Sequence, residues 1–190
     1  DDGSRDATAE LARAAGAHVV SLASTEGKGQ AMTAAARGAL AADPGGPEDV
    51  FVLCDGDLGE SAGLLPALAS AAGPGGADLA VAAFARSVGG GFGLALGFAA
   101  WAIRRRCGLS TRAPISGQRA VRRRTLEAAL PFAAGYGMEI GMTIDAVRAG
   151  ARVVEIELDL AHRATGRTAA GFAHRARQLA DFARVYALRR

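Results

Sequence analysis

Short apolar runs alternate with segments of helical periodicity along this chain, and this alternation limits its fold more than any other feature. The runs VFVLC (50–54) and LAVAAF (79–84) are apolar throughout, as strands buried on both faces of a sheet are. Strands are predicted at 18–22, 50–54, 79–84, 114–122 and 151–160. Helices are predicted at 5–17, 29–42, 61–72, 92–106, 123–130, 137–150 and 171–190. This order predicts an α/β fold with a mostly parallel sheet and helices on both of its faces.

The composition fits one globular domain, residues 1–190, and excludes a disordered segment because half of the residues are apolar. The net charge of +3 comes almost wholly from arginine, since Lys28 is the only lysine. We expect no nucleic-acid partner, because no basic groove interleaved with aromatic residues and no Cys/His finger spacing is present. Cys54 and Cys107 make no disulfide framework, and the chain opens with acids rather than with a signal peptide. A cytoplasmic location is therefore expected.

The opening residues, DDGSRDAT, have the composition of a loop that follows a strand, yet no strand precedes them. We therefore expect the domain to be truncated at its N-terminus and to lack its first strand or strands.

The longest apolar run, at 92–103, is too short to span a bilayer and is followed by Arg104, Arg105 and Arg106. One interpretation is a core helix with a solvated end. Others are a peripheral contact with the membrane, where arginines reach anionic headgroups, and the surface of a homodimer.

The sequence DGD places two carboxylates, Asp55 and Asp57, at the end of an apolar strand. Like charges this close are costly unless a positive group lies between them. Hard oxygen ligands two residues apart suit Mg²⁺ or Mn²⁺, which can bridge to a diphosphate. The pattern predicts a metal site at the carboxyl edge of the sheet, where α/β proteins bind their ligands.

Six segments in order resemble family 2 glycosyltransferases of the GT-A fold, which bind nucleotide-diphospho-sugars. They are DDGSRDAT, GKGQAM, VFVLCDGDL, SGQRAVRRRTLE, GYGMEIGMTIDAVRAG and VVEIELDLAHRATGR. GKGQAM and PFAAGYGMEIG are similar to glucosyl-3-phosphoglycerate synthases, whereas SGQRAVRR and HRATGRT are also similar to polyprenyl-phosphate sugar synthases. The loop ARSVGGGFG departs from the former, since it lacks their Arg-Val-Thr run.

The resemblance implies roles for residues on the donor side. Asp2 is expected to hydrogen-bond the nucleotide base, while Gly27 and Lys28 lie near the nucleotide or its phosphates. Asp55 faces the ribose or the metal, and Asp57 binds the metal directly. The late histidine, His162, completes the metal site, since imidazole ligates Mn²⁺ readily and Mg²⁺ less so.

The resemblance also implies roles on the acceptor side. Glu139 is expected to face the acceptor, either as the base that takes a proton from its hydroxyl or as the group that positions it. Arg119, Arg163 and Arg167 are candidates for contacts to phosphates of the donor or acceptor.

These features favour a metal-dependent, non-processive transfer of a sugar from a UDP- or GDP-type donor to a small or lipid-linked acceptor. The apolar stretch and its arginines favour a polyprenyl phosphate slightly. A sugar-nucleotide nucleotidyltransferase and a non-catalytic nucleotide-binding module of the same fold remain alternatives.

Overall fold

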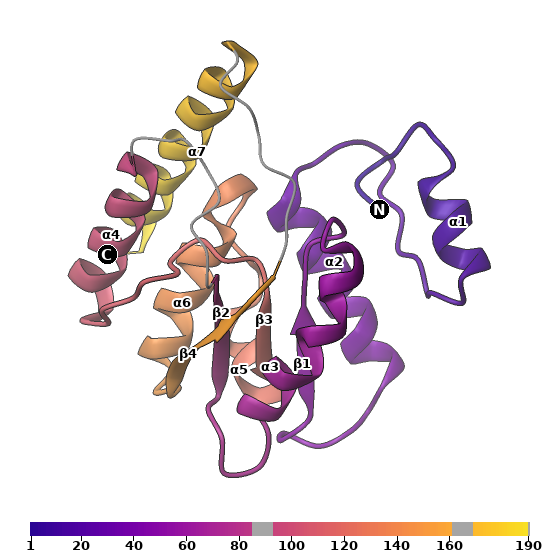
Figure 1. The fold of residues 1–190 in the computed structure, drawn as a ribbon, viewed down its shortest axis with the longest axis horizontal. Coiled ribbons are helices and arrows are strands. Elements are labelled where there is room, and N and C mark those ends of the chain that lie inside the picture. Colours follow the sequence, from indigo (N-terminus) through magenta and orange to yellow (C-terminus); the bar gives the residue numbers. More distant parts are fainter. Residues whose placement is uncertain (85–92, 161–168, 190) are drawn as a thin grey trace.

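The computed structural model describes residues 1–84, 93–160 and 169–189, and in the last helix it describes side chains only from Arg177 onward. Four strands form one sheet in the order β1-β3-β2-β4 (Figure 1). The strands are β1 (Val50–Leu53), β2 (Leu79–Phe84), β3 (Arg119–Arg122) and β4 (Val153–Leu158). The α-helices are α1 (Thr8–Ala14), α2 (Lys28–Ala42), α3 (Leu65–Ala71), α4 (Leu94–Cys107), α5 (Arg123–Ala129), α6 (Met138–Arg148) and α7 (Ala169–Leu188). Two short 3-10 helices, η1 (Gly59–Leu64) and η2 (Gly135–Gly137), precede α3 and α6.

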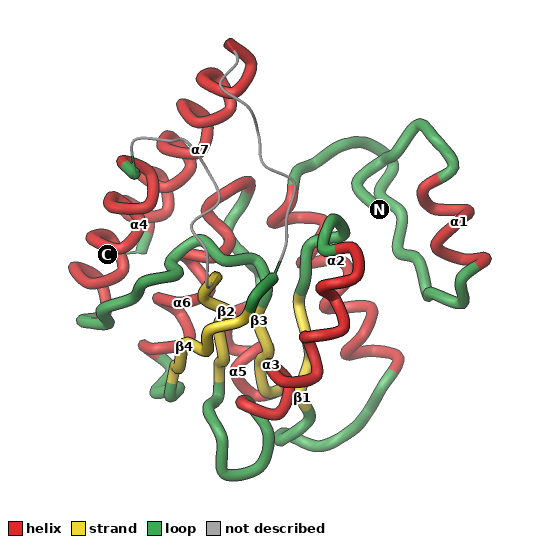
Figure 2. The backbone as a smooth tube through the Cα atoms, in the orientation of Figure 1, coloured by secondary structure: helices red, strands yellow, loops and turns green. Residues whose placement is uncertain are grey.

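The sheet is mixed. β2 and β4 pair in parallel, whereas β3 lies between β1 and β2 and runs antiparallel to both. Three strands therefore share one direction, as a mostly parallel sheet requires, but the short β3 is reversed. The α/β class is confirmed, and so are helices on both faces of the sheet (Figure 2).

One face of the sheet carries the larger core. Successive residues of a strand point to opposite faces, so Leu79 and Val81 of β2 share a face. They belong to a buried cluster with Ala36 of α2, Leu126 of α5 and Met142 of α6. Leu79, Leu126 and Met142 have no exposed surface. Burying a leucine or methionine side chain stabilises the fold by about 1.5–3 kcal/mol. This cluster therefore packs α2, α5 and α6 against the sheet.

The opposite face and an outer helical layer complete the architecture. Ala80 of β2 packs with Leu68 of α3 on the other face. Ile140 of α6 packs with Ile103 of α4 and Phe182 of α7, which places α4 and α7 outside α6 (Figure 1). The order of layers is thus α3, the sheet, then α2, α5 and α6, and finally α4 and α7. Helix α1 has no buried residue.

The strand predicted at 18–22 does not form. Two backbone hydrogen bonds join this segment to Asp1: the Asp1 nitrogen donates to Val20 O (2.8 Å), and Leu22 N donates to Asp1 O (2.9 Å). A strand needs a longer ladder, and among the described residues the segment has no strand beside it. The residues at 18–22 therefore have no regular secondary structure, and the predicted strand is wrong.

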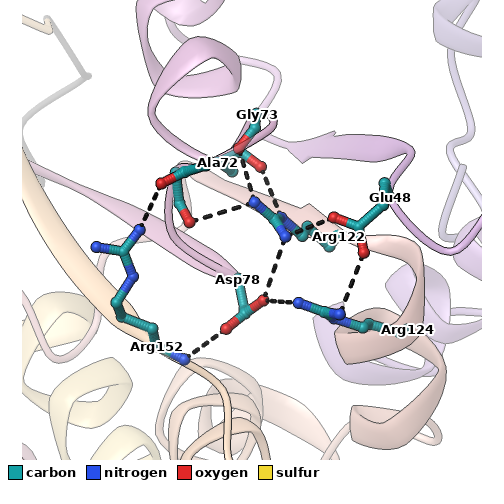
Figure 3. Close-up of polar contacts among 9 residues, drawn as sticks. Glu48, Ala72, Gly73, Asp78, Arg122, Arg124 and Arg152 are labelled. Atoms are coloured by element: carbon teal, nitrogen blue, oxygen red, sulfur yellow. Dashed lines mark hydrogen bonds and ion pairs between the residues drawn. The ribbon is translucent and has the colours of Figure 1, made fainter.

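Arg122, at the last position of β3, is buried at the edge of the sheet opposite to Asp55 and Asp57. Figure 3 shows the polar contacts of Arg122. Its guanidinium donates to Ala72 O (3.1 Å) and Gly73 O (2.7 Å) and pairs with Glu48 (2.5 Å) and Asp78 (3.7 Å). One side chain thus holds the turn between α3 and β2 and the segment before β1.

Two further arginines extend this network through the same acids. Arg124 pairs with Asp78 (2.6 Å) and Glu48 (3.1 Å), and the Arg152 backbone N–H donates to Asp78 (2.7 Å). Although desolvation alone raises it, the pKa of Asp78 is lowered by hydrogen bonds from Arg124 and Arg152 and by the charges of Arg124 and Arg122.

Candidate active site

The candidate site lies where β1 ends and β3 begins. Because Leu53 is paired with Arg119 in an antiparallel ladder, the residues just before β3 lie beside those just after β1. Gly117 shows how closely they approach: a Cβ built on it would lie 2.4 Å from Asp55 Oδ2 and 2.8 Å from Lys28 Nζ. Only glycine fits there without displacing the pair.

Lys28 is the positive group beside the first acid of DGD. Its Nζ lies 2.7 Å from Asp55 Oδ1 and 2.6 Å from Glu139 Oε1. Desolvation by itself lowers the pKa of Lys28, but the charge of Glu139 and the hydrogen bond and charge of Asp55 more than offset it, so the pKa is raised. One ammonium therefore joins a carboxylate from the end of β1 to a carboxylate from α6.

Glu139 lies in the first turn of α6, with only 6% of its side chain exposed. The turn before it, η2, is held by α7: Tyr136 N donates to Asp181 Oδ2 (3.0 Å). Gly135 has φ +60°, and a Cβ on it would lie 2.2 Å from Asp181 Oδ2. The GYG sequence thus lets α7 approach closely and fixes where α6 begins.

Asp2 anchors the loop before α2. Its carboxylate accepts from Glu26 N (2.7 Å) and Gly27 N (2.9 Å). Gly27 has φ +94°, a conformation that favours glycine. Asp2 and Gly27 therefore place Lys28 at the start of α2, and their contact to a nucleotide stays a prediction.

Gln118 is a site residue that the sequence reasoning missed. It is 1% exposed, its Nε2 donates to Asp55 Oδ2 (2.9 Å), and its Oε1 accepts from Ser116 Oγ (3.4 Å). A polar amide in an otherwise strand-like segment, directly after Gly117, was the available signal.

Arg119 is not placed to meet a phosphate. It has no exposed surface, and its guanidinium donates to Ser116 O (2.8 Å), Thr143 Oγ1 (2.9 Å) and Pro114 O (3.3 Å). Desolvation lowers its pKa to about 10, against the raising effect of Glu139 and Glu155. In this structure Arg119 supports the segment before β3 rather than a ligand.

Asp57 is exposed, and it makes no hydrogen bond or ion pair to the described residues. No group of three or more His, Cys, Asp or Glu side chains gathers around a metal position within the part of the chain that the structure describes. The donor set nevertheless suits Mg²⁺ or Mn²⁺, because Asp57 offers unengaged carboxylate oxygens. Together with Asp55, Glu139 and Lys28, it gives the site a formal charge of minus two, which a divalent cation would balance.

Three predicted site residues lie outside what the structure describes. His162, Arg163 and Arg167 fall in the range 161–168. The glycine-rich loop that departs from the phosphoglycerate pattern is likewise outside it over 85–92.

The site thus combines acidic side chains, one lysine and a buried amide at one edge of an α/β sheet. A comparison of the sequence with family models agrees with this geometry: the model of the family "Glycosyl transferase family 2" matches residues 1–129. The chain belongs to glycosyl transferase family 2. No curated protein sequence matches the chain closely enough to add to this assignment.

Solved structures of the Mycobacterium tuberculosis glucosyl-3-phosphoglycerate synthase are similar to this family 2 chain. The complex with Mn²⁺, UDP-glucose and phosphoglyceric acid is 30% identical over 97% of the chain, with a TM-score of 0.69. The complex with Mg²⁺ and UDP is also 30% identical over 97% of the chain, with a TM-score of 0.70. The chain spans 66% of the length of each of these structures. The resemblance to family 2 and to glucosyl-3-phosphoglycerate synthases that was inferred from the sequence is thereby confirmed.

A second surface is formed by α4 and α7. Leu94 and Trp101 of α4 are 70% and 49% exposed, and Trp101 lies 4.8 Å from the ring of Tyr186, between centroids. Trp101, Arg104 and Arg105 line an open hollow of about 320 Å³. Among the described helices, none has both the length and the apolarity needed to cross a membrane.

Proposed function

We propose that residues 1–190 form one GT-A domain, the core of a metal-dependent, non-processive glycosyltransferase that uses a UDP-sugar. The observation that carries this proposal is the contact of Lys28 with both Asp55 and Glu139, beside the exposed Asp57, in a chain of family 2. UDP is favoured over GDP because the similar mycobacterial structures hold UDP or UDP-glucose.

The roles of the site residues follow from their positions. Asp57, whose oxygens are unengaged by described residues, would hold the divalent cation, with His162 as a further ligand. The cation, when bound, neutralises charge that develops on the departing diphosphate. Asp55 is held by Lys28 and Gln118 and would accept a hydrogen bond from the ribose, or else share the metal.

Glu139 would face the acceptor. Its burial and its 2.6 Å contact with Lys28 hold the carboxylate in one orientation. In that position it would accept the proton of an attacking hydroxyl, or orient an acceptor that needs no base. Arg163 and Arg167 remain candidates for phosphate contacts.

For the acceptor we propose a small anionic molecule, because the similar structures include complexes with phosphoglyceric acid. A polyprenyl phosphate, favoured from the sequence, is not supported by those structures. The exposed Leu94 and Trp101 beside Arg104 and Arg105 are the observation that keeps a lipid-linked acceptor and a peripheral membrane contact as the second candidate. The cytoplasmic location and the homodimer remain predictions.

The test is a calorimetric titration of the full-length protein with UDP and with GDP, each with Mn²⁺ and with EDTA. We expect UDP to bind tightly only with Mn²⁺, and Asp57→Asn to lose that metal dependence. Glu127→Gln, which removes one charge from the exposed face of α5, is the control and should bind as the wild type does. Equal UDP binding in Mn²⁺ and EDTA would contradict the metal-dependent mechanism.

Transfer assays then separate the acceptors. Sugar transfer from UDP-glucose to 3-phosphoglycerate, without liposomes, would support the small acceptor. Transfer only to polyprenyl phosphate in anionic vesicles would support the lipid-linked one. Release of pyrophosphate from UTP and glucose 1-phosphate would instead indicate a nucleotidyltransferase.

A further inference from the structure

The amide of Gln118 completes the environment of Asp55. Asp55 has two oxygens, and each has a protein donor: Oδ1 accepts from Lys28 Nζ (2.7 Å) and Oδ2 from Gln118 Nε2 (2.9 Å). Gln118 itself cannot turn freely, since Ser116 Oγ donates to its Oε1 (3.4 Å) and it is 1% exposed. The carboxylate plane of Asp55 is therefore set from both sides.

The backbone of Gln118 is fixed as well. The residue directly precedes β3, and its carbonyl oxygen accepts from Ala82 N of β2 (3.0 Å). Gly117, before it, leaves no room for a Cβ beside Asp55 and Lys28. The amide thus lies directly before a strand that is paired with a neighbour on each side.

From this anchor a continuous chain of contacts runs across the site. Gln118 donates to Asp55, Lys28 joins Asp55 to Glu139, and Glu139 lies in the first turn of α6. The first acid lies on the donor side of the proposed reaction and the last on the acceptor side. A displacement of Asp55 would therefore move the Lys28 ammonium and change its contact with Glu139.

The charges around Gln118 favour a neutral hydrogen-bond donor over a charged side chain at this position. Asp55 and Glu139 already share the single cation Lys28, and Asp57 adds a further negative charge nearby in the sequence. A carboxylate in place of the amide would lie beside Asp55 with no cation of its own, and one of the two would have to hold a proton. The amide gives the hydrogen bond without that cost.

We propose that Gln118 is a positioning residue of the transferase: it holds Asp55 in the orientation that serves the donor and, through Lys28, sets the place of Glu139. This proposal rests on the proposed function. Gln118 touches neither donor nor acceptor in this assignment, so its effect on transfer passes through Asp55.

Two nearly isosteric variants of the full-length protein separate positioning from simple stability. Gln118→Met removes the hydrogen bond without adding charge, and Gln118→Glu replaces the donor by a carboxyl. Gln178→Glu on α7, which has no contact to the site among the described residues, is the matched control. Each protein is assayed for transfer from UDP-glucose with Mn²⁺ between about pH 5.5 and about pH 8, around the range where a carboxyl of raised pKa titrates.

We expect Gln118→Met to lower kcat/KM by about 10- to 100-fold, as for one lost hydrogen bond to a charged group, by a similar factor at every pH. Gln118→Glu should be close to Gln118→Met at about pH 5.5 and fall further at about pH 8, because the introduced carboxyl must then ionise beside Asp55. A merely structural role would lower the amount of folded protein at each pH, but kcat/KM calculated per folded enzyme would then match the wild type for both variants. Transfer by Gln118→Met within about twofold of the wild type would overturn the proposal, since about 0.4 kcal/mol is too little for such a bond.

A measurement without substrate keeps this test separate from the proposed function. Urea unfolding of Gln118→Glu should show a loss of stability that grows as pH rises, because the folded state raises the pKa of the new carboxyl above its unfolded value. Gln178→Glu should show no such trend. If the wild type transfers no sugar but this trend appears, the proposed function fails and the contact to Asp55 stands. If the wild type is active and the trend is absent, the contact fails.

Discussion

Replacing Arg119 by Met tests whether this buried arginine supports the fold or binds a phosphate. The side chain has no exposed surface and donates to Ser116 O, Thr143 Oγ1 and Pro114 O. Met fills a similar length with apolar atoms and leaves these three acceptors without their donor. The variant should therefore be less stable before any ligand is added.

The size of the effect follows from two opposing contributions. Each hydrogen bond from a charged donor contributes about 1.5–3 kcal/mol, so three contribute roughly 5–9 kcal/mol. Against this, burial lowers the pKa of Arg119 to about 10, a change that corresponds to about 3 kcal/mol of desolvation cost at about 1.4 kcal/mol per pKa unit. We expect a net loss of about 2–6 kcal/mol in the free energy of unfolding.

Urea denaturation of the full-length protein measures this loss. With a slope of about 2 kcal/mol/M, the midpoint should fall by roughly 1–3 M. Arg104→Met, on the exposed face of α4, is the control and should stay within about 0.5 kcal/mol of the wild type. A stable Arg119→Met protein that has lost only sugar transfer would refute the reasoning and return Arg119 to the phosphate-binding candidates.

Three further predictions concern other parts of the structure. Gly29→Ala should unfold the loop after α5 or fail to fold, because its Cβ would lie 1.9 Å from Ala133 O; a thermal melt equal to that of Gly38→Ala, on the same helix, would contradict this. Although desolvation alone raises it, hydrogen bonds from Thr111 and the Ala113 and Arg112 N–H groups lower the pKa of Glu155. Glu155→Gln should therefore lose about 1–3 kcal/mol at neutral pH, and the difference should shrink as pH falls through the folded-state pKa; a difference independent of pH would be the contrary result. Lys28→Met should weaken UDP binding with Mn²⁺ in calorimetry by about tenfold or more, as the loss of a charged contact implies; unchanged affinity would remove Lys28 from the donor site.

Much of the fold could be predicted because its signals are local. The apolar run at 79–84 is β2 with the predicted bounds, and GKGQAM begins a helix at Lys28, one residue before the prediction. The segment 18–22 misled for a reason outside itself: its residues suit a strand, but a strand exists only where another lies beside it. The reversed direction of β3 was equally invisible, since direction within a sheet depends on the path of the preceding connection.

Some residues of the candidate site could likewise be identified from the sequence, and others could not. DGD and GYGME identified Asp55, Asp57 and Glu139 as chemistry-bearing positions, and the structure brings Asp55 and Glu139 to one ammonium. Gln118 and the burial of Arg119 could not be read from spacing, because both depend on which residues β1 and α6 bring alongside β3. An arginine in a strand looks the same in sequence whether it faces solvent or the core.

The network of Arg122 and Asp78 (Figure 3) lies at the opposite edge of the sheet from Asp55 and Lys28, because Val50 pairs with Arg122 and Leu53 with Arg119. Its contacts join the segments at the amino ends of β1 and β2, and none of its members takes part in the proposed chemistry. This separation affects which parts of the protein can accept substitutions during evolution. Loops at the edge that holds Asp55 and Lys28 can be altered to accept a new substrate, because the opposite edge keeps the strands in register. A laboratory library aimed at acceptor choice should therefore vary those loops and leave the arginine-rich edge unchanged.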